Sequence, residues 1–215
     1  MMKKAVIFDF DYTLGDSTKG IVQSVNYGMK QMGLMERGRG EIVKTIGLSL
    51  AKTYEKLTGR ADKSEIERFE HYFVEKADEI MVANTVLYDG VADMLEGMQR
   101  NKIKTGIVTT KYRYRIDHIL CANGVRQLID IIVGGDDVRH VKPDPEGILS
   151  VSQQLGMELG EMLYVGDHVV DAQAAQAAGI DFIAVLTGTA GREDFQKYPH
   201  VCIVKEVRQI RAFIE

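Results

Sequence analysis

Short apolar runs recur along the chain, and all but the last are followed by a turn rich in Asp, Thr or Gly. The first run covers residues 4–8. The others lie at residues 104–108, 130–133, 162–165, 182–186 and 201–204. Continuous apolar runs of this length are typical of strands that are buried on both faces of a sheet. The pattern therefore predicts a buried sheet of up to six strands.

Helix-like segments alternate with these runs. They cover residues 89–99, 114–123, 145–155 and 169–178. The last three stop at Gly124, Gly156 and Gly179, and glycine directly after a helix is a common stop signal. Alternating strands and helices favour a parallel sheet with right-handed crossovers. We therefore predict an α/β fold with a Rossmann-like parallel sheet and helices on both of its faces.

Residues 17–84 break this alternation, because they contain no convincing strand pattern. Apolar residues recur there at helical spacing: Ile21, Val25, Met29 and Met32, then Ile42, Ile46 and Leu50, then Ile66, Phe69, Phe73, Ala77 and Ile80. The spacing predicts an insert of about four helices. The chain would then consist of an α/β core, residues 1–16 and 85–215, and a helical cap, residues 17–84. Ligands bind at the carboxyl ends of strands in open α/β sheets, so a cap inserted after the first strand is expected to act as a lid.

Composition narrows the functional classes. The 215 residues are 45% hydrophobic and 27% charged, with a formal net charge of -4. This balance is ordinary for a globular protein and argues against general nucleic-acid binding. No apolar stretch reaches membrane-spanning length, and no secretory signal is evident. The two cysteines lie far apart and favour a reducing cytoplasm over a disulfide. We expect a cytoplasmic protein, monomeric or dimeric, with no nucleic-acid or membrane partner.

Two carboxylates follow the first apolar run. Asp9 and Asp11 are separated by one residue, so both are expected near the end of a buried strand. Like charges at such a place repel unless a cation joins them. Mg²⁺ suits the position, because it takes few carboxylates together with water and substrate oxygens. An Asp-rich turn that caps a helix is the ordinary alternative.

Polar groups also follow the later strands. Thr109 and Thr110 end the second strand, Lys142 precedes two prolines, and Asp167 and Asp171 follow a strand and a glycine. Each has an ordinary alternative as a helix cap, a solvated lysine or a charge at a helix N-terminus. Together they place acid, hydroxyl, lysine and acid at successive strand ends. This set suits phosphoryl transfer, which needs a nucleophile, a metal and donors for the phosphoryl oxygens.

With these motifs the sequence resembles the haloacid dehalogenase-like hydrolases along its whole length. The motifs are Asp9-Phe-Asp11-Tyr-Thr13, Thr109, Lys142 in "KPDP", and Gly166-Asp167-His-Val-Val-Asp171. The helical insert, "TIGLSL" at 45–50 and "GGDDV" at 134–138 are similar to the phosphoglycolate phosphatase-like branch. The resemblance implies a small phosphorylated metabolite as substrate and Mg²⁺ as cofactor.

The resemblance also implies a role for each acid. Asp9 would attack phosphorus and form an aspartyl-phosphate. Asp11 would protonate the leaving oxygen and later deprotonate the hydrolytic water. Mg²⁺ would be held by Asp9, by the main-chain carbonyl of Asp11 and by Asp167, while Asp171 would support the metal waters or Lys142. The phosphoryl oxygens would be bound by Thr109, the neighbouring amides and hydroxyl at Thr110, and Lys142.

Three further positions are candidates for substrate or cap contacts. Tyr12 and His168 stand where the family often has Gly and Ser, and Gly47 lies in the "TIGLSL" segment. The alternatives are a packing role for Tyr12 and an exposed imidazole for His168. Candidates for an anionic substrate tail, most of them expected to be solvated, are Lys19, Lys44, Lys52 and Lys111.

The second acid helps to choose among relatives. The dehalogenases lack an equivalent of Asp11, so its presence favours phosphate substrates. We expect a phosphatase acting on a small, phosphoglycolate-like monoester. An inorganic pyrophosphatase and a β-phosphoglucomutase-like phosphotransferase are alternatives, although "DSTKGIVQS" lacks the His of the mutases. A catalytically silent phosphate- or partner-binding module is a different class. Met29, Met32 and Met35 would suit a partner groove, but their spacing favours the buried face of a cap helix.

Overall fold

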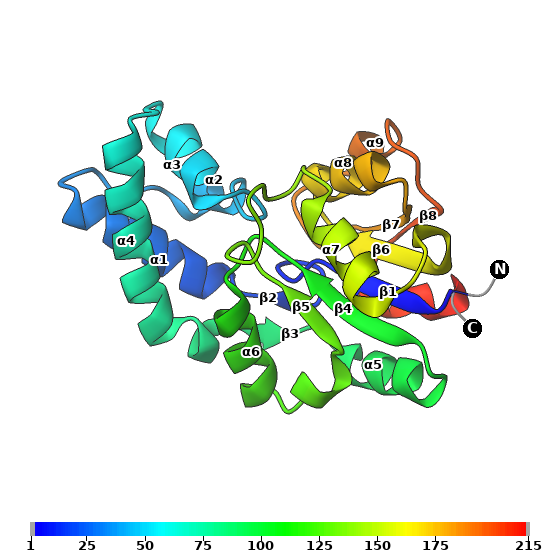
Figure 1. The fold of residues 1–215 in the computed structure, drawn as a ribbon. Coiled ribbons are helices and arrows are strands. Elements are labelled where there is room, and N and C mark those ends of the chain that lie inside the picture. The colour runs from blue at the N-terminus through cyan, green and yellow to red at the C-terminus, as the bar shows by residue number, and fades with distance from the viewer. Residues whose placement is uncertain (1–2, 214–215) are drawn as a thin grey trace. The chain divides into compact units, whose positions relative to one another are not determined.

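A six-stranded parallel sheet forms the centre of the α/β unit (Figure 1). The computed structural model describes residues 3–213. The strands are β1 (Ala5–Phe8), β4 (Lys104–Val108), β5 (Ile131–Val133), β6 (Met162–Gly166), β7 (Asp181–Val185) and β8 (Cys202–Val204), in the order β5-β4-β1-β6-β7-β8. Every neighbouring pair is parallel. The predicted parallel α/β fold is therefore confirmed.

The register of the central strands sets the position of their carboxyl ends. Phe8 at the end of β1 lies level with Ile107 of β4 and with Val165 of β6. The residues that follow these strands therefore emerge side by side at one edge of the sheet. All four residues of β1 are buried, which agrees with a strand covered on both faces.

Helices cover both faces of the sheet. They are α5 (Val91–Arg100), α6 (Arg113–Ala122), α7 (Glu146–Leu155), α8 (Val169–Ala178) and the short α9 (Arg192–Phe195), with 3-10 turns at Arg126–Leu128, Leu159–Glu161 and Val207–Phe213. Side chains of α7 and α8 form one buried cluster with the strands, while α5 packs against β4 and the last 3-10 turn. Both α7 and α8 end at glycines in the left-handed region, Gly156 and Gly179, as their sequences predict. Within residues 3–213, no helix is both long enough and apolar enough to cross a membrane.

The second compact unit, Asp16–Val86, is helical. It contains α1 (Thr18–Gln31), α2 (Arg39–Val43), α3 (Leu50–Thr58), α4 (Lys63–Ile80) and a 3-10 turn at Val82–Asn84. Its core forms where α1 packs on α4. A Cβ on Gly28 would lie 3.0 Å from the Phe69 ring, and the Tyr54 and Phe69 rings are 5.2 Å apart. The chain enters and leaves the unit through β2 (Gly15–Asp16) and β3 (Val86–Leu87), two short strands that pair with each other and that the sequence pattern did not predict.

Two details of the helical unit differ from the sequence pattern. The apolar series from Ile42 to Leu50 does not form one helix, because Gly47 is left-handed at φ 94° and Ser49 caps a new helix by accepting a hydrogen bond from the Lys52 amide. The interpretation of the methionine series is wrong at its end. Helix α1 stops at Gln31, so Met29 is buried but Met35 is 79% exposed on the loop beyond the helix.

Candidate active site

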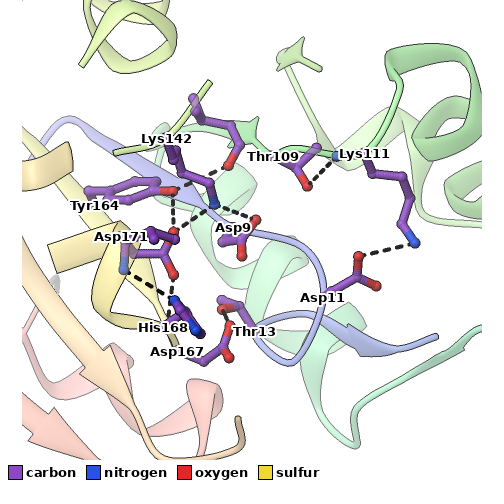
Figure 2. A network of polar contacts seen from close by, with 12 residues as sticks. Asp9, Asp11, Thr13, Thr109, Lys111, Lys142, Tyr164, Asp167, His168 and Asp171 are labelled. Carbon is purple, nitrogen blue, oxygen red and sulfur yellow. Dashed lines mark hydrogen bonds and ion pairs between the residues drawn. The ribbon is translucent and has the colours of Figure 1, made fainter. Parts of the chain in front are cut away.

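The carboxyl ends of β1, β4 and β6 bring the predicted polar residues together (Figure 2). Asp9 directly follows β1, and its amide donates to the Val165 carbonyl at 2.9 Å. The side chains gathered at this edge, all of them buried, are Asp9, Asp11, Thr109, Lys111, Lys142, Asp167 and Asp171. We refer to the four aspartates and two lysines of this set as the charged cluster. Its burial excludes the reading of these groups as ordinary solvated charges.

Lys142 connects two carboxylates. Its Nζ lies 2.8 Å from Asp9 Oδ1 and 2.6 Å from Asp171 Oδ1. The Tyr164 hydroxyl is 3.0 Å from the same Asp171 oxygen, and the His168 amide donates to Asp171 Oδ2 at 2.9 Å. Both oxygens of Asp171 are thus occupied by protein donors, which makes it a rigid support for Lys142.

Asp167 is held by residues from two other loops. The Thr13 hydroxyl donates to Asp167 Oδ1 at 3.0 Å. On the other side, a Cβ built on Gly188 would lie 1.9 Å from Asp167 Oδ2. Only glycine therefore leaves room for this carboxylate. Gly188 belongs to none of the sequence motifs, although the apolar run before Thr187-Gly188 ends in the same kind of polar turn as the other strands.

The turn after Asp11 is fixed in an uncommon conformation. Tyr12 is left-handed at φ 61°, a region that costs a non-glycine residue about 1–2 kcal/mol. Its amide donates to the Gly15 carbonyl at 2.7 Å, and its carbonyl accepts a hydrogen bond from the Thr187 hydroxyl. The left-handed backbone gives a physical reason for the glycine that the family often has at this position. Thr187, like Gly188, was not predicted.

Lys111 differs from the other lysines considered for substrate binding. Its side chain is only 6% exposed, and its Nζ lies 3.1 Å from Asp11 Oδ2. Lys111 is therefore an exception to the expectation that most of these lysines are solvated. The remaining oxygen, Asp11 Oδ1, is buried without a hydrogen-bond partner among residues 3–213.

The other predicted residues have simpler surroundings. The Thr109 hydroxyl accepts a hydrogen bond from the Lys111 amide at 3.2 Å, and Thr110 follows it half-buried in the same loop. His168 is half-buried and caps α8, because its Nδ1 accepts from the Val170 amide at 3.2 Å. It is not a fully exposed imidazole. Gly47 belongs to the helical unit, in the turn between α2 and α3.

The pKa values of the cluster show a surplus of negative charge. Burial, with the nearby Asp171 and Asp11, raises the pKa of Asp9 to about 7 even though Lys142 lowers it. Burial and the charges of Asp171 and Asp9 also raise the pKa of Asp167 well above its ordinary value. Burial alone would lower the pKa of Lys142, but Asp171 and Asp9 outweigh it and raise this pKa, so Lys142 keeps its proton.

The cluster fits a divalent cation. Oxygen atoms of Asp9, Asp167 and Asp171 all lie within 4.8 Å of one another. When ionised, the four carboxylates exceed the two ammonium groups by two negative charges. A divalent cation would neutralise this excess, and buried carboxylate oxygens are the ligands that Mg²⁺ prefers. Asp171 is the least suited to direct binding, because its oxygens already accept hydrogen bonds from protein donors.

The chain is similar in sequence to known proteins along most of its length. A family model described as haloacid dehalogenase-like hydrolase matches residues 6–185. The phosphoglycolate phosphatase of Salmonella typhimurium is 30% identical over 210 aligned residues, covering 86% of this chain and 82% of that protein. The phosphoglycolate phosphatase of Escherichia coli K12 shows the same identity and coverage.

Solved structures share the fold. A protein from Bacteroides fragilis, described as a haloacid dehalogenase-like hydrolase, is 38% identical, with a TM-score of 0.94 over 97% of this chain and 99% of that chain. A predicted phosphoglycolate phosphatase from Haemophilus somnus superposes with a TM-score of 0.89 over 100% of this chain and 99% of that chain. It is 22% identical, and its likeness extends to the fold alone.

Proposed function

Because the chain belongs to the haloacid dehalogenase-like hydrolases and is a phosphatase, we propose that it hydrolyses a small, phosphoglycolate-like phosphate monoester with the aid of Mg²⁺. The family and the phosphoglycolate phosphatase-like branch that the motifs indicate are confirmed by the family model and by the curated relatives. The substrate, the cofactor and the individual residue roles are parts of the proposal. The observation that supports it most is the placement of Asp9, whose carboxylate is paired with Lys142 at 2.8 Å and lies within 4.8 Å of carboxylate oxygens of Asp167 and Asp171.

In the first half of the reaction Asp9 acts as the nucleophile. One of its carboxylate oxygens forms a bond to phosphorus while the bond from phosphorus to the ester oxygen breaks. Asp11 gives a proton to the departing oxygen, which leaves as an alcohol. In the second half Asp11 takes a proton from a water molecule that attacks phosphorus. The bond between Asp9 and phosphorus then breaks, releasing phosphate and restoring the Asp9 carboxylate and the protonated carboxyl group of Asp11.

Residues of the neighbouring loops bind the phosphoryl oxygens. Lys142 is held by Asp171 and remains protonated, so it neutralises charge on these oxygens. The Thr109 oxygen accepts from the Lys111 amide, which leaves the hydroxyl proton for a phosphoryl oxygen. Thr110 lies in the same loop and contributes its amide and hydroxyl.

The charged cluster would hold the metal. Mg²⁺ would be bound by Asp9, by the main-chain carbonyl of Asp11 and by Asp167, with Asp171 supporting from behind through Lys142. When bound, the cation would supply positive charge that stabilises the phosphoryl oxygens and the ionised acids. Thr13 and the absence of a side chain at Gly188 orient Asp167 for this task. We further propose that the helical unit, Asp16–Val86, serves as the lid that excludes bulk water.

A substrate screen tests the proposal. Purified protein with Mg²⁺ would be assayed for phosphate release from a panel of small phosphate monoesters, phosphoglycolate among them, together with pyrophosphate and phosphosugars. We expect release from small monoesters, and its loss on addition of EDTA. Hydrolysis of pyrophosphate alone would favour a pyrophosphatase. Isomerisation of a phosphosugar would favour a phosphotransferase. No turnover of any compound, with phosphate binding retained, would favour a silent module.

A further inference from the structure

Each catalytic carboxylate of the proposed reaction has its own buried lysine. Asp9 is paired with Lys142 at 2.8 Å, and Asp11 is paired with Lys111 at 3.1 Å. Lys142 belongs to the family motifs, whereas Lys111 has no catalytic role in the proposed reaction. A buried lysine needs a reason, because removing an ammonium group from water is costly unless it is paired. The pair with Asp11 supplies that reason and suggests a function.

The backbone and side chain of Lys111 are held in place from several directions. Its amide donates to the Thr109 hydroxyl at 3.2 Å, and its carbonyl accepts from the Gly135 amide at 3.0 Å. The two loops touch so closely that a Cβ on Gly135 would lie 2.5 Å from the Thr110 carbonyl oxygen. The ammonium group also lies 6.0 Å from the centre of the Phe10 ring. Lys111 therefore presents its charge to Asp11 from a rigid base.

The pairing distinguishes the two oxygens of Asp11. Oδ2 faces the ammonium group of Lys111, which is a donor and has no lone pair to accept a hydrogen bond. Oδ1 is buried and has no hydrogen-bond partner among the described residues. A proton carried by Asp11 therefore belongs on Oδ1. Because burial without a hydrogen-bond partner is costly, Oδ1 is suited to bond with a group that arrives with the substrate.

We infer that Lys111 is a positioning residue for Asp11: by holding Oδ2 it presents Oδ1 to the ester oxygen. This inference depends on the proposed phosphatase reaction. The proton on Oδ1 goes to the ester oxygen as its bond to phosphorus breaks, and Oδ1 then receives a proton from the attacking water. Lys111 itself forms and breaks no covalent bond. Without Lys111 the carboxyl group would rotate, and the proton would be misplaced.

The test compares leaving groups. p-Nitrophenolate leaves without protonation, whereas an alkoxide needs a proton from Asp11. We expect Lys111→Met to lower kcat/KM for an alkyl phosphate, which reports the half-reaction in which the ester oxygen leaves, by roughly 10- to 100-fold, part of the 10²- to 10⁴-fold that general acid catalysis provides. The kcat/KM for p-nitrophenyl phosphate should fall much less, and Lys111→Arg should recover part of the loss on the alkyl phosphate. In Asp11→Asn, which has no acid to position, adding Lys111→Met should cause no further selective loss.

Lys104→Met is the matched control. Lys104 is the first residue of β4, the strand that precedes the Lys111 loop, and it is also paired with a carboxylate, Asp130 at 2.6 Å, but its side chain is 50% exposed. Lys104→Met should leave kcat/KM for both esters unchanged. An equal loss of kcat/KM on both esters would mean that Lys111 binds substrate and would overturn the inference, because hydrolysis of the shared aspartyl-phosphate does not enter kcat/KM. If Lys111→Met does not fold, Lys111→Gln and Lys111→Arg give the same comparison. Wild-type protein inactive on every ester would instead overturn the proposed function.

Discussion

The two units of this protein bury different kinds of polar groups. In the described part of the helical unit the buried polar side chains are all hydroxyls: Ser17, Thr18, Ser24, Thr45, Thr53 and Thr85. Several of them donate to backbone carbonyls nearby, as Ser24 does to Gly20 at 2.9 Å. Within residues 3–213, the α/β unit instead buries seven charged side chains, the six of the charged cluster and Arg115.

This difference separates structural from functional burial. A hydroxyl that bonds to its own helix satisfies itself locally and costs little to bury. A buried carboxylate remains costly even when it is paired, and the raised pKa values of Asp9 and Asp167 record that cost. Where the protein buries more carboxylate charge than its own cationic side chains neutralise, a cation and a phosphoryl group are therefore expected to bind.

The largest expected effect is the loss of phosphatase activity when Asp9 is replaced. Replacing the nucleophile in Asp9→Asn should lower phosphate release by roughly 10⁴-fold or more, because no covalent intermediate can form. The fold should survive, since the substitution removes a buried charge with a raised pKa. Steady-state assays would measure the rate of phosphate release, and thermal unfolding would measure the stability of the fold. Glu36→Gln, on an exposed loop residue of the helical unit, is the control. Full activity in Asp9→Asn would contradict the nucleophile assignment.

A lysine substitution tests the cost of buried charge directly. Lys142→Met leaves Asp9 and Asp171 without their shared cation, so the free energy of unfolding should fall by about 3–5 kcal/mol. Ser24→Ala removes one local hydrogen bond in the helical unit and should cost about 1 kcal/mol. Denaturant unfolding of both variants would measure the contrast. Similar losses from the two substitutions would show that the units do not differ in this way.

A glycine outside the family motifs should control metal binding. In Gly188→Ala the new methyl group would collide with Asp167 Oδ2, so the carboxylate must move. We expect Mg²⁺ affinity to fall by about 10- to 100-fold, as is usual when the orientation of a metal ligand is disturbed. Titration calorimetry would measure this without any assay of turnover. Gly191→Ala is the matched control, since its nearest neighbour would be an Asp194 oxygen at 3.7 Å. Unchanged affinity in Gly188→Ala would argue that Asp167 is no ligand.

The smallest effect concerns pH. Because folding raises the pKa of Asp9 from 3.8 to about 7, the metal-free fold holds this proton more tightly than the unfolded chain does. The stability from this group is fully present below its unfolded pKa and is lost as pH rises through its folded pKa. Mg²⁺ needs ionised ligands, so it should raise the melting temperature more at about pH 8 than at about pH 5. Melting curves with Mg²⁺ or EDTA would check this, and an equal shift at both values would contradict it.

Most of the fold was predictable because its signals are local. Buried strands are continuous apolar runs, and helices such as α7 and α8 stop at glycines, so both can be recognised within short windows. The candidate residues Asp9, Thr109 and Asp167 were predictable for a related reason, since polar groups directly after buried strands are conspicuous. The break between α2 and α3 was missed, because apolar spacing continues through the left-handed Gly47.

Residue order alone established which segments form strands and helices and which acids, hydroxyls and lysine follow the strands. Only the tertiary structure decided that Lys111 is buried against Asp11, that Gly188 makes room for Asp167, and that Thr187 holds the Tyr12 turn. These contacts join residues from the loops that follow β1, β4, β6 and β7, and the residues are up to 175 positions apart. They depend on strand order and register, which arise from packing across the whole sheet and leave no periodic signal in any single segment.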